Sequence, residues 1–339
     1  MTLTEILALG ARLGATTHGV VAAAELRLAG ADPDAVKAAL GKHWQRPVSG
    51  IYVVDDRPLT DVVKAHVAVK HAGHGAVVTG LFAARWLSLR WVPPSTQVHV
   101  LIDTRRRRRG SEGFVLVRRF HDVARLPTWT YENLRVAPVP QVVVDAAREL
   151  SELRDVRGLV LGAIADDRCT VAQVRAVLDG GAIPHTALAR RACLDAERGA
   201  ASPPEAELVD GLLRYGVPFH CNVEVWLNGQ FLGVADVWLV GTGVGGEVDS
   251  REHHAARDKL DETLVRHSRF EHAGLSLCHV TPTRYRAAPH VFHQALFDEV
   301  ARRERLGLRE PEGLVLKPRG PLLQGNPRTA PPYRLPPPR

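Results

Sequence analysis

Acidic residues flank a glycine-rich turn in the C-terminal half of the chain. Asp236 lies near the end of one apolar run, and Glu247 and Asp249 lie in the next. Alternate residues of a strand share a face, so Glu247 and Asp249 are expected to project together. Mg²⁺ binds hard oxygen ligands, usually one or two carboxylates completed by phosphate and water, and it activates water for attack on a phosphodiester. The pattern therefore predicts a Mg²⁺ site formed by Asp236 and Glu247, with solvated turn carboxylates as the alternative.

Other polar residues could complete such a site. Glu205, in the predicted helix start Ser202-Pro203-Pro204-Glu205, is expected to add a carboxylate to the same edge, or else to serve only the helix dipole. His253 and His254 follow the acids and are candidates for a general base or a phosphate contact. Arg266, on the helix after them, is a candidate contact for the scissile phosphate, with ion pairing inside the fold as its competing use.

The turn itself, residues 241–246, matches the pattern G-x-G-x-x-G. In a dinucleotide-binding loop that pattern leads directly into a helix, whereas here a strand is predicted next. We therefore interpret the glycines as a flexible turn between strands. The surrounding order is that of an α/β sandwich: a helix over 204–215, strands over 220–227, 231–240 and 246–249, a helix over 257–273 and a strand over 275–280. Asn228-Gly229 predicts a hairpin between the first two strands.

The N-terminal residues predict a small DNA-binding domain. Apolar residues at helical spacing indicate short helices over 4–28, and Asp32-Pro33 begins a third helix that extends to about residue 43. Three helices followed by a hairpin are typical of a winged helix, whose third helix enters the major groove. The alternative is a small helical domain that only packs. The candidate DNA contacts are Lys37, Lys42, Trp44, Gln45 and Arg46.

A basic run lies between two predicted strands, over residues 97–102 and 114–117. It consists of Arg105, Arg106, Arg107, Arg108 and Arg109. Arginine side chains match phosphate oxygens and release counterions from nucleic acid, so these residues are further candidate DNA contacts. A solvated loop is the alternative, because runs of like charge are commonly exposed to water.

The composition sets limits on the protein class. A chain of 339 residues that is 45% hydrophobic is long enough for two or three domains, and its net charge of +7 favours anionic partners. No signal-peptide pattern or membrane-spanning run appears, so we expect a cytoplasmic protein without a membrane partner. The four cysteines form no C-x-x-C pair and are interpreted as reduced thiols. Prolines crowd residues 318–339, where a solvated basic tail without packed structure is expected.

Two groups of short motifs resemble known families. Trp44-Gln45-Arg46-Pro47, Gly50-Ile51-Tyr52 and Val77-Val78-Thr79-Gly80, together with the arginine run, resemble actinobacterial proteins that have an AbiEi-type antitoxin N-terminal domain. Gly233-Val234-Ala235-Asp236 and the motif Glu247-Val248-Asp249-Ser250-Arg251-Glu252-His253-His254 resemble an uncharacterised domain related to very-short-patch-repair (Vsr-like) endonucleases of the PD-(D/E)XK type. Together the two resemblances cover most of residues 10–285.

The resemblances imply a multi-domain α+β and α/β chain. Its expected parts are a winged helix over 1–60, a basic α/β middle domain over 61–150, a helical connector over 151–200, a restriction-endonuclease-like α/β domain over 201–288, and a helix with a Pro- and Arg-rich disordered tail over 289–339. In that nuclease class Asp236 and Glu247 would bind Mg²⁺, and a lysine follows two residues after the second acid. Asp249 stands at that position here. We hypothesise that His253, His254 or Lys259 replaces the lysine.

The expected function is therefore that of a DNA-binding protein with a nuclease-like C-terminal domain, cutting DNA with Mg²⁺ in a defence or toxin–antitoxin setting. The alternative is a non-catalytic antitoxin or transcriptional autorepressor. In that case the nuclease fold is an inactive scaffold that holds DNA, a cognate toxin or a second copy of the chain.

Overall fold

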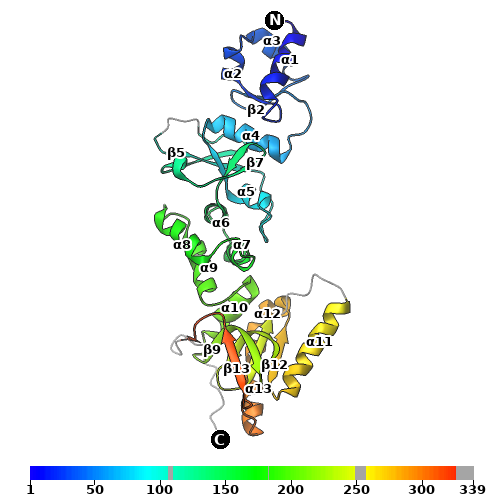
Figure 1. Ribbon diagram of the computed structural model, residues 1–339, viewed down its shortest axis with the longest axis vertical. Coiled ribbons are helices and arrows are strands. Elements are labelled where there is room, and N and C mark those ends of the chain that lie inside the picture. Colours follow the sequence, from blue (N-terminus) through cyan, green and yellow to red (C-terminus); the bar gives the residue numbers. More distant parts are fainter. Residues whose placement is uncertain (106–109, 182, 249–256, 326–339) are drawn as a thin grey trace. The chain divides into compact units, whose positions relative to one another are not determined.

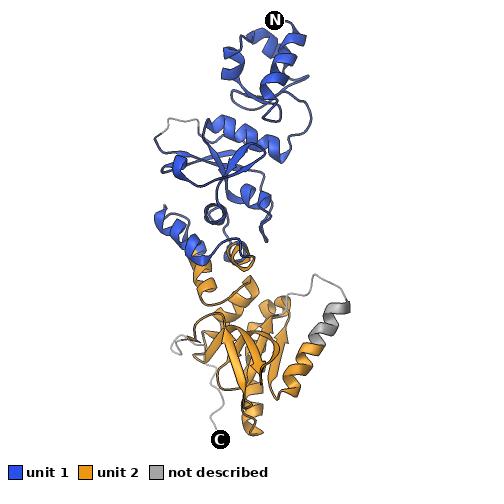
Figure 2. Cartoon of the chain, in the orientation of Figure 1, with its two compact units in different colours: residues 1–159, 167–189 blue, residues 160–166, 190–339 orange. Residues whose placement is uncertain are grey.

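The structure is a computed structural model that describes residues 1–105, 110–181, 183–248 and 257–325. It divides into two compact units, one formed by Met1–Leu159 and Asp167–Ala189, the other by Val160–Asp166 and Arg190–Arg339 (Figure 2). Within the described residues the chain forms three β-sheets and a larger number of helices (Figure 1). The multi-domain mixed α and β class expected from the sequence is confirmed.

The first unit begins with three helices and a small antiparallel sheet of order β1-β3-β2. The elements are α1 (Leu3–Gly14), β1 (Val20–Ala22), α2 (Ala23–Leu28), α3 (Pro33–Ala39), β2 (Gln45–Val48) and β3 (Ile51–Val53). The Asp32 side chain caps α3 and Pro33 occupies its first turn, as predicted. The helix ends at Ala39 instead of about residue 43, because Leu40 is already extended, with ψ 140°.

A five-stranded sheet of order β6-β5-β4-β8-β7 completes most of this unit. Its elements are α4 (Asp61–Ala72), β4 (Val77–Thr79), α5 (Gly80–Trp86), β5 (Val98–Asp103), β6 (Val115–Phe120), η1 (Val123–Arg125), β7 (Trp129–Tyr131), β8 (Leu134–Val136) and α6 (Val139–Ala147). The helices α7 (Leu153–Ala165), α8 (Val171–Gly180) and α9 (Ala187–Glu197) follow. The arginine run thus begins two residues after β5 and precedes β6.

The second unit is built on a six-stranded sheet of order β12-β11-β10-β9-β13, with β14 also paired to β9. Its elements are α10 (Pro203–Leu212), β9 (Pro218–Leu227), β10 (Gln230–Leu239), β11 (Val244–Val248), α11 (Arg257–His272), β12 (Ser276–Val280), α12 (Pro282–Ala287), α13 (Pro289–Arg305), β13 (Leu314–Pro318) and β14 (Leu323–Gln324). Asn228 and Gly229 both have positive φ, 51° and 81°, so they form the predicted tight turn between β9 and β10.

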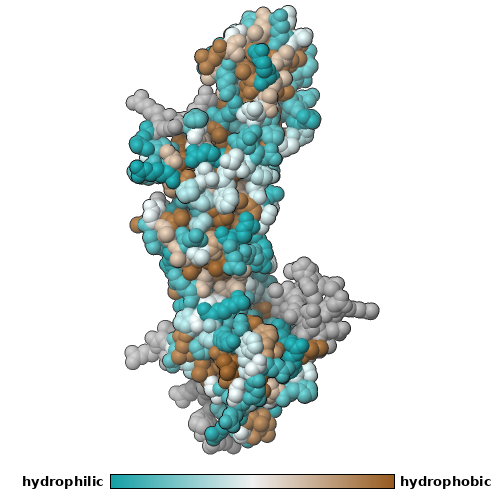
Figure 3. Space-filling view, viewed as in Figure 1, coloured by the Kyte–Doolittle hydropathy of each residue, from teal (hydrophilic) through white to brown (hydrophobic). Residues whose placement is uncertain are grey.

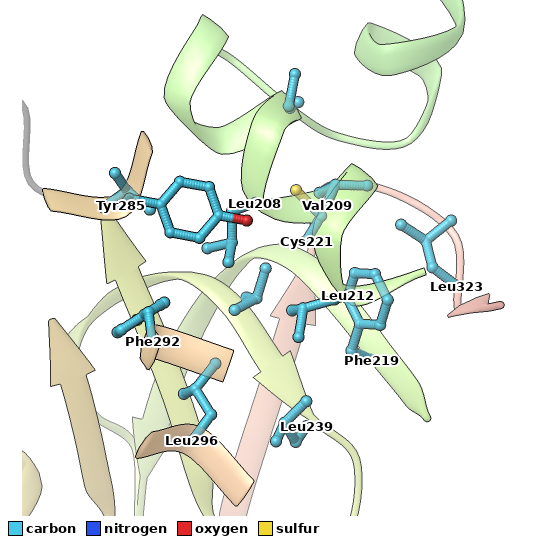
Figure 4. Packing of buried hydrophobic residues seen from close by; sticks show 14 of the residues in the cluster. Leu208, Val209, Leu212, Phe219, Cys221, Leu239, Tyr285, Phe292, Leu296 and Leu323 are labelled. Atoms are coloured by element: carbon cyan, nitrogen blue, oxygen red, sulfur yellow. The ribbon is translucent and has the colours of Figure 1, made fainter. Parts of the chain in front are cut away.

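Apolar side chains cover both faces of this sheet. On one face, Leu208 and Leu212 of α10 and Leu296 of α13 pack in one cluster with Phe219 of β9 (Figure 4). On the other face Phe270 of α11 lies against Trp238 of β10, with ring centroids 6.3 Å apart. The strands between these layers are consequently held in fixed register.

The predicted start of the third strand is two residues late. Gly245 and Gly246 belong to β11 because a larger residue would not fit there: an added Cβ would lie 2.8 Å from the Trp238 ring at Gly245 and 3.0 Å from Val237 at Gly246. The glycines are therefore strand residues selected for close packing, and only residues 241–243 form the turn.

The prediction of no packed structure from Pro318 onward is wrong for residues 318–325. Both β13 and β14 pair with β9, and Leu323 is 8% exposed in the same core as Phe219 (Figure 4). These pairings satisfy backbone groups that β9 would otherwise present at a sheet edge. Residues 326–339 lie outside the described part of the chain.

Hydrophilic and hydrophobic residues are mixed on the surface. Figure 3 shows hydrophilic residues interspersed with hydrophobic ones on the viewed face of both units. Among the described residues, no helix combines the length and the hydropathy needed to cross a bilayer.

The packing of the C-terminal segment generates a first prediction. Leu323→Ala removes a buried side chain and should lower the free energy of unfolding of the second unit by about 2 to 4 kcal/mol. Leu322→Ala, at a neighbour that is 55% exposed, should change it by less than about 0.5 kcal/mol. Urea denaturation followed by fluorescence compares the two variants, and equal effects would contradict the assignment of Leu323 to the core.

Candidate functional site

A row of polar residues crosses four strands of the second unit. Glu247 on β11 is paired with His279 on β12 in the parallel ladder. Asp236 on β10 lies one position beyond the pair Val237–Gly246, which sets it opposite Glu247. On its other side Asp236 is opposite Asn222 of β9, between the pairs Ala235–Val223 and Val237–Cys221. The sheet register therefore brings Asp236 and Glu247 together, as expected from the sequence.

Asp236 lies in an environment that disfavours its charge. Its Oδ2 accepts a hydrogen bond of 2.7 Å from the backbone N–H of Val248. Burial raises the pKa of Asp236 well above the ordinary value of 3.8, and the negative charges of Glu205 and Glu247 raise it further. The Val248 N–H and Arg266 act in the opposite direction but do not compensate fully. This carboxyl group consequently favours a bound proton or a nearby cation.

Glu205 is held at the start of α10 by hydrogen bonds. It lies in the first turn of α10, where its Oε1 accepts from Ser202 Oγ at 2.7 Å and its Oε2 accepts from the backbone N–H of Ala201 at 2.8 Å. Its Oε2 also accepts a hydrogen bond from Asn222 Nδ2. The same Asn222 nitrogen donates a second hydrogen bond to the backbone carbonyl of Gly199. Glu205 is thus a helix-start residue, and its charge also acts on Asp236.

Glu247 forms an ion pair with Arg266 of α11. The Arg266 Nη2 lies 2.6 Å from Oε1 and 2.8 Å from Oε2 of Glu247, which is 8% exposed. His267 Nε2 is 3.9 Å from the same carboxylate, and its ring packs against that of His279 with centroids 4.8 Å apart. Arg266 was predicted to contact DNA, but in this structure its guanidinium is directed at the predicted metal pair.

The side chains of the remaining predicted residues of this site are not described. Asp249, His253 and His254 lie outside the described residues, and the side chain of Lys259 is not described.

Asn222 and His279 were not among the residues predicted from the sequence. Asn222 left little signal, since His220 and Glu224 are also polar residues of the same strand, and His279 becomes relevant only through its register with Glu247.

The donor set at this position is suited to a hard cation. In the described part of the chain no group of three or more His, Cys, Asp and Glu side chains could by itself hold a metal. Mg²⁺ needs less, because one or two carboxylates suffice when phosphate and water complete the shell. Asp236 and Glu247, set opposite each other by the sheet register, are such a pair of hard oxygen donors. These residues therefore fit Mg²⁺ as ligands.

The candidate DNA contacts of the first unit fall into two groups. Lys37, Lys42 and Arg46 are exposed. Trp44 is only 2% exposed and packs in the core with Ile6 and Leu26, so its predicted contact with DNA is wrong. The indole ring fills a space that Gly10 of α1 leaves open.

The side chain of Gln45 also has a structural role. Its Nε2 donates to the backbone carbonyls of Asp55 and Arg57, at 2.8 and 2.7 Å, and so fixes the segment that follows β3. An amide that is used in this way is not free to bind phosphate without breaking those bonds.

Hydrogen bonds hold the chain at Arg105 and at Glu112, on either side of residues 106–109. Arg105 donates to both oxygens of Asp103 at 2.9 Å, although its side chain is 75% exposed. These hydrogen bonds hold the pKa of Asp103 well below its usual range. Beyond the run, Glu112 Oε1 accepts from the backbone N–H and Oγ of Ser49, at 2.8 and 2.7 Å, in the turn between β2 and β3. Arg106, Arg107, Arg108 and Arg109 lie outside the described residues.

The environment of Asp236 generates a second prediction. Asp236→Asn mimics the protonated carboxyl, so it should raise the Tm by a few degrees at pH 7 in the absence of divalent cations. Because the folded pKa is raised, wild-type stability is lost as the pH rises through it, and the gain should therefore grow from about pH 4 and then level off. Thermal unfolding across this pH range measures the difference.

Asp298→Asn, at an exposed position on α13, is the matched control and should show no such pH-dependent gain. A Tm of Asp236→Asn below that of the wild type at pH 7 would contradict the account of an unfavourable buried charge.

Comparisons with known proteins show little similarity. No family model matches the chain, and no curated protein matches it. Among solved structures, the chain is similar to the crystal structure of the RV2827C protein from Mycobacterium tuberculosis, with 16% sequence identity and a TM-score of 0.38. That similarity covers 56% of this chain and 76% of the other.

Proposed function

We propose that the chain binds DNA and that its C-terminal unit hydrolyses phosphodiester bonds with a divalent cation, Mg²⁺ above all. The observation that carries this proposal is that the sheet register brings Asp236 and Glu247 together, with Glu205 acting on Asp236 from the start of α10. Carboxylates that repel one another in a partly buried place are typical of sites that need a cation or a proton.

The roles of the residues follow from their positions. Asp236 and Glu247 would hold the ion, and Glu205, fixed by Asn222, would keep a further negative charge close to Asp236. A bound Mg²⁺ supplies a polarised phosphate and an activated water. Arg266 would bind a phosphate oxygen, for which its planar guanidinium is suited. Asp249, in place of the motif lysine, and the histidines His253 and His254 remain candidates for orienting the water.

The first unit supports the DNA-binding part of the proposal. Its order α1-β1-α2-α3-β2-β3 and its sheet order β1-β3-β2 agree with a winged helix. Lys37, Lys42 and Arg46 are exposed on or just after α3, where that fold would present them to DNA. The net charge of +7 favours the same class of partner.

A second candidate function is favoured by the ion pair between Glu247 and Arg266. An arginine that neutralises Glu247 satisfies that carboxylate without any metal. In this case the C-terminal unit is a non-catalytic scaffold, and the chain is an antitoxin-like autorepressor that binds DNA, a toxin partner or a second copy.

Cleavage of supercoiled plasmid separates the two functions and is the third prediction. Wild-type protein should nick the plasmid with Mg²⁺ or Mn²⁺. Asp236→Asn and Glu247→Gln should each lose about a hundredfold or more in rate, since each removes a metal ligand worth several kcal/mol. Asp298→Asn should cut like the wild type. A wild-type protein that binds DNA but cuts it with neither cation would leave the scaffold function as the better account.

DNA affinity measured against salt is the fourth prediction. Lys37→Ala, Lys42→Ala and Arg46→Ala should each weaken binding to unrelated duplexes and reduce the slope of log K against log salt by about 1 for each phosphate that the variant no longer neutralises. Lys64→Ala is a suitable control, because Lys64 already pairs with Asp61 on α4. If the three variants keep the wild-type slope, α3 and β2 do not face the phosphates.

A further inference from the structure

We infer that Arg266 occupies the cation position on Glu247 until nucleic acid draws it away, so that DNA and a divalent cation bind cooperatively. This inference rests on the proposed function and concerns the regulation of the same site. It assigns to one residue both the ion pair seen in the structure and the phosphate contact expected from the sequence.

The geometry of the ion pair is the first step. A single nitrogen, Nη2 of Arg266, lies nearly equidistant from the two carboxylate oxygens of Glu247, at 2.6 and 2.8 Å. A metal ion chelated by both oxygens of a carboxylate lies in the same place, between them and in front of them. The charged nitrogen and a cation chelated in this way therefore exclude each other.

The second step is that the site needs a positive charge from one source or the other. Asp236 sets negative charge beside Glu247, Glu205 adds its charge next to Asp236, and the Val248 N–H offsets only part of it. With Arg266 in place, Glu247 is neutralised and has little affinity left for a cation. Without it, Asp236 and Glu247 face each other on neighbouring strands, and the repulsion between their charges favours cation binding.

The third step is that Arg266 is able to move its charged end. Its side chain is 20% exposed, whereas its stem is confined at Gly233, where an added Cβ would lie 3.0 Å from Cδ of Arg266 and 3.0 Å from the Phe270 ring. The stem is thus held against β10, so a change of partner requires rotation at the guanidinium end of the side chain only. Guanidinium groups bind phosphate at least as well as carboxylate, by paired hydrogen bonds.

These steps predict a linkage between the two ligands. A phosphate that attracts Arg266 frees Glu247 for the cation, and a cation on Glu247 frees Arg266 for phosphate. By reciprocity each ligand must raise the affinity of the other by the same factor, and we expect a factor of about ten. The affinity for the cation should therefore be lower without DNA than with it.

The test uses the full-length chain with Ca²⁺, a hard cation for oxygen ligands, and a short duplex oligonucleotide. Calorimetry gives the Kd for Ca²⁺ without DNA, and fluorescence anisotropy gives the Kd for the duplex with and without Ca²⁺. Arg266→Gln should bind Ca²⁺ about tenfold more tightly than the wild type, and Ca²⁺ should no longer tighten its binding to DNA. Arg266→Lys keeps a charged nitrogen and should behave like the wild type.

Arg269→Gln is the matched control, because Arg269 lies one turn later on α11 and is exposed. If Arg266→Gln binds Ca²⁺ no more tightly than Arg269→Gln, or if Ca²⁺ leaves the DNA affinity of the wild type unchanged, the inference is overturned while the proposed metal site stands. If the affinity for Ca²⁺ stays the same in Asp236→Asn as in the wild type, the proposed function fails as well. Circular dichroism of each variant verifies that it is folded.

Discussion

The burial of neighbouring carboxylates at one position of the sheet is the constraint on which the candidate site of the C-terminal unit depends. Asp236 and Glu247 lie on neighbouring strands whose register holds them together, and Glu205 adds its charge from the start of α10. Each is offset by a local donor: the Val248 N–H for Asp236, Arg266 for Glu247, and the Asn222 amide with the start of α10 for Glu205. The raised pKa of Asp236 shows that the offset is incomplete. Such a residual imbalance is costly for a fold and useful for a site.

The rest of the unit keeps these groups from relaxing apart. Apolar layers cover both sheet faces, and β13 and β14 cover one side of β9. Arg303, 2% exposed, donates to the carbonyls of Thr242 and Gly274, at 2.9 and 2.7 Å. It thereby ties the turn before β11 to the turn before β12. The two strands that carry Glu247 and His279 are thus fixed at their starting ends, and a change in the site must come from side chains instead of from the sheet.

Local signals in the sequence predict much of this arrangement, but they do not predict contacts between residues that are distant in the chain. The turn at Asn228-Gly229 and the cap at Asp32 depend on neighbouring residues alone, and both were predicted correctly. The pairing of Asp236 with Glu247 was predictable because a short turn joins their strands. Trp44 and Leu323 were misjudged, since their burial depends on Gly10 and on the edge of β9, far away in the chain. The pairing of Arg266 with Glu247 could be foreseen only as a competing use.

The ion pair between Arg266 and Glu247 itself bears on function. Burying a charged pair gains little stability over well-packed apolar residues of similar size, because desolvation offsets the attraction. A scaffold that had only to be stable would be served as well by leucine or methionine at these two positions. An arginine that bridges both oxygens of Glu247, next to the buried carboxyl of Asp236, keeps Glu247 charged beside a second acid until another cation arrives. The charge arrangement is therefore better explained by a site that binds a cation than by one that only folds.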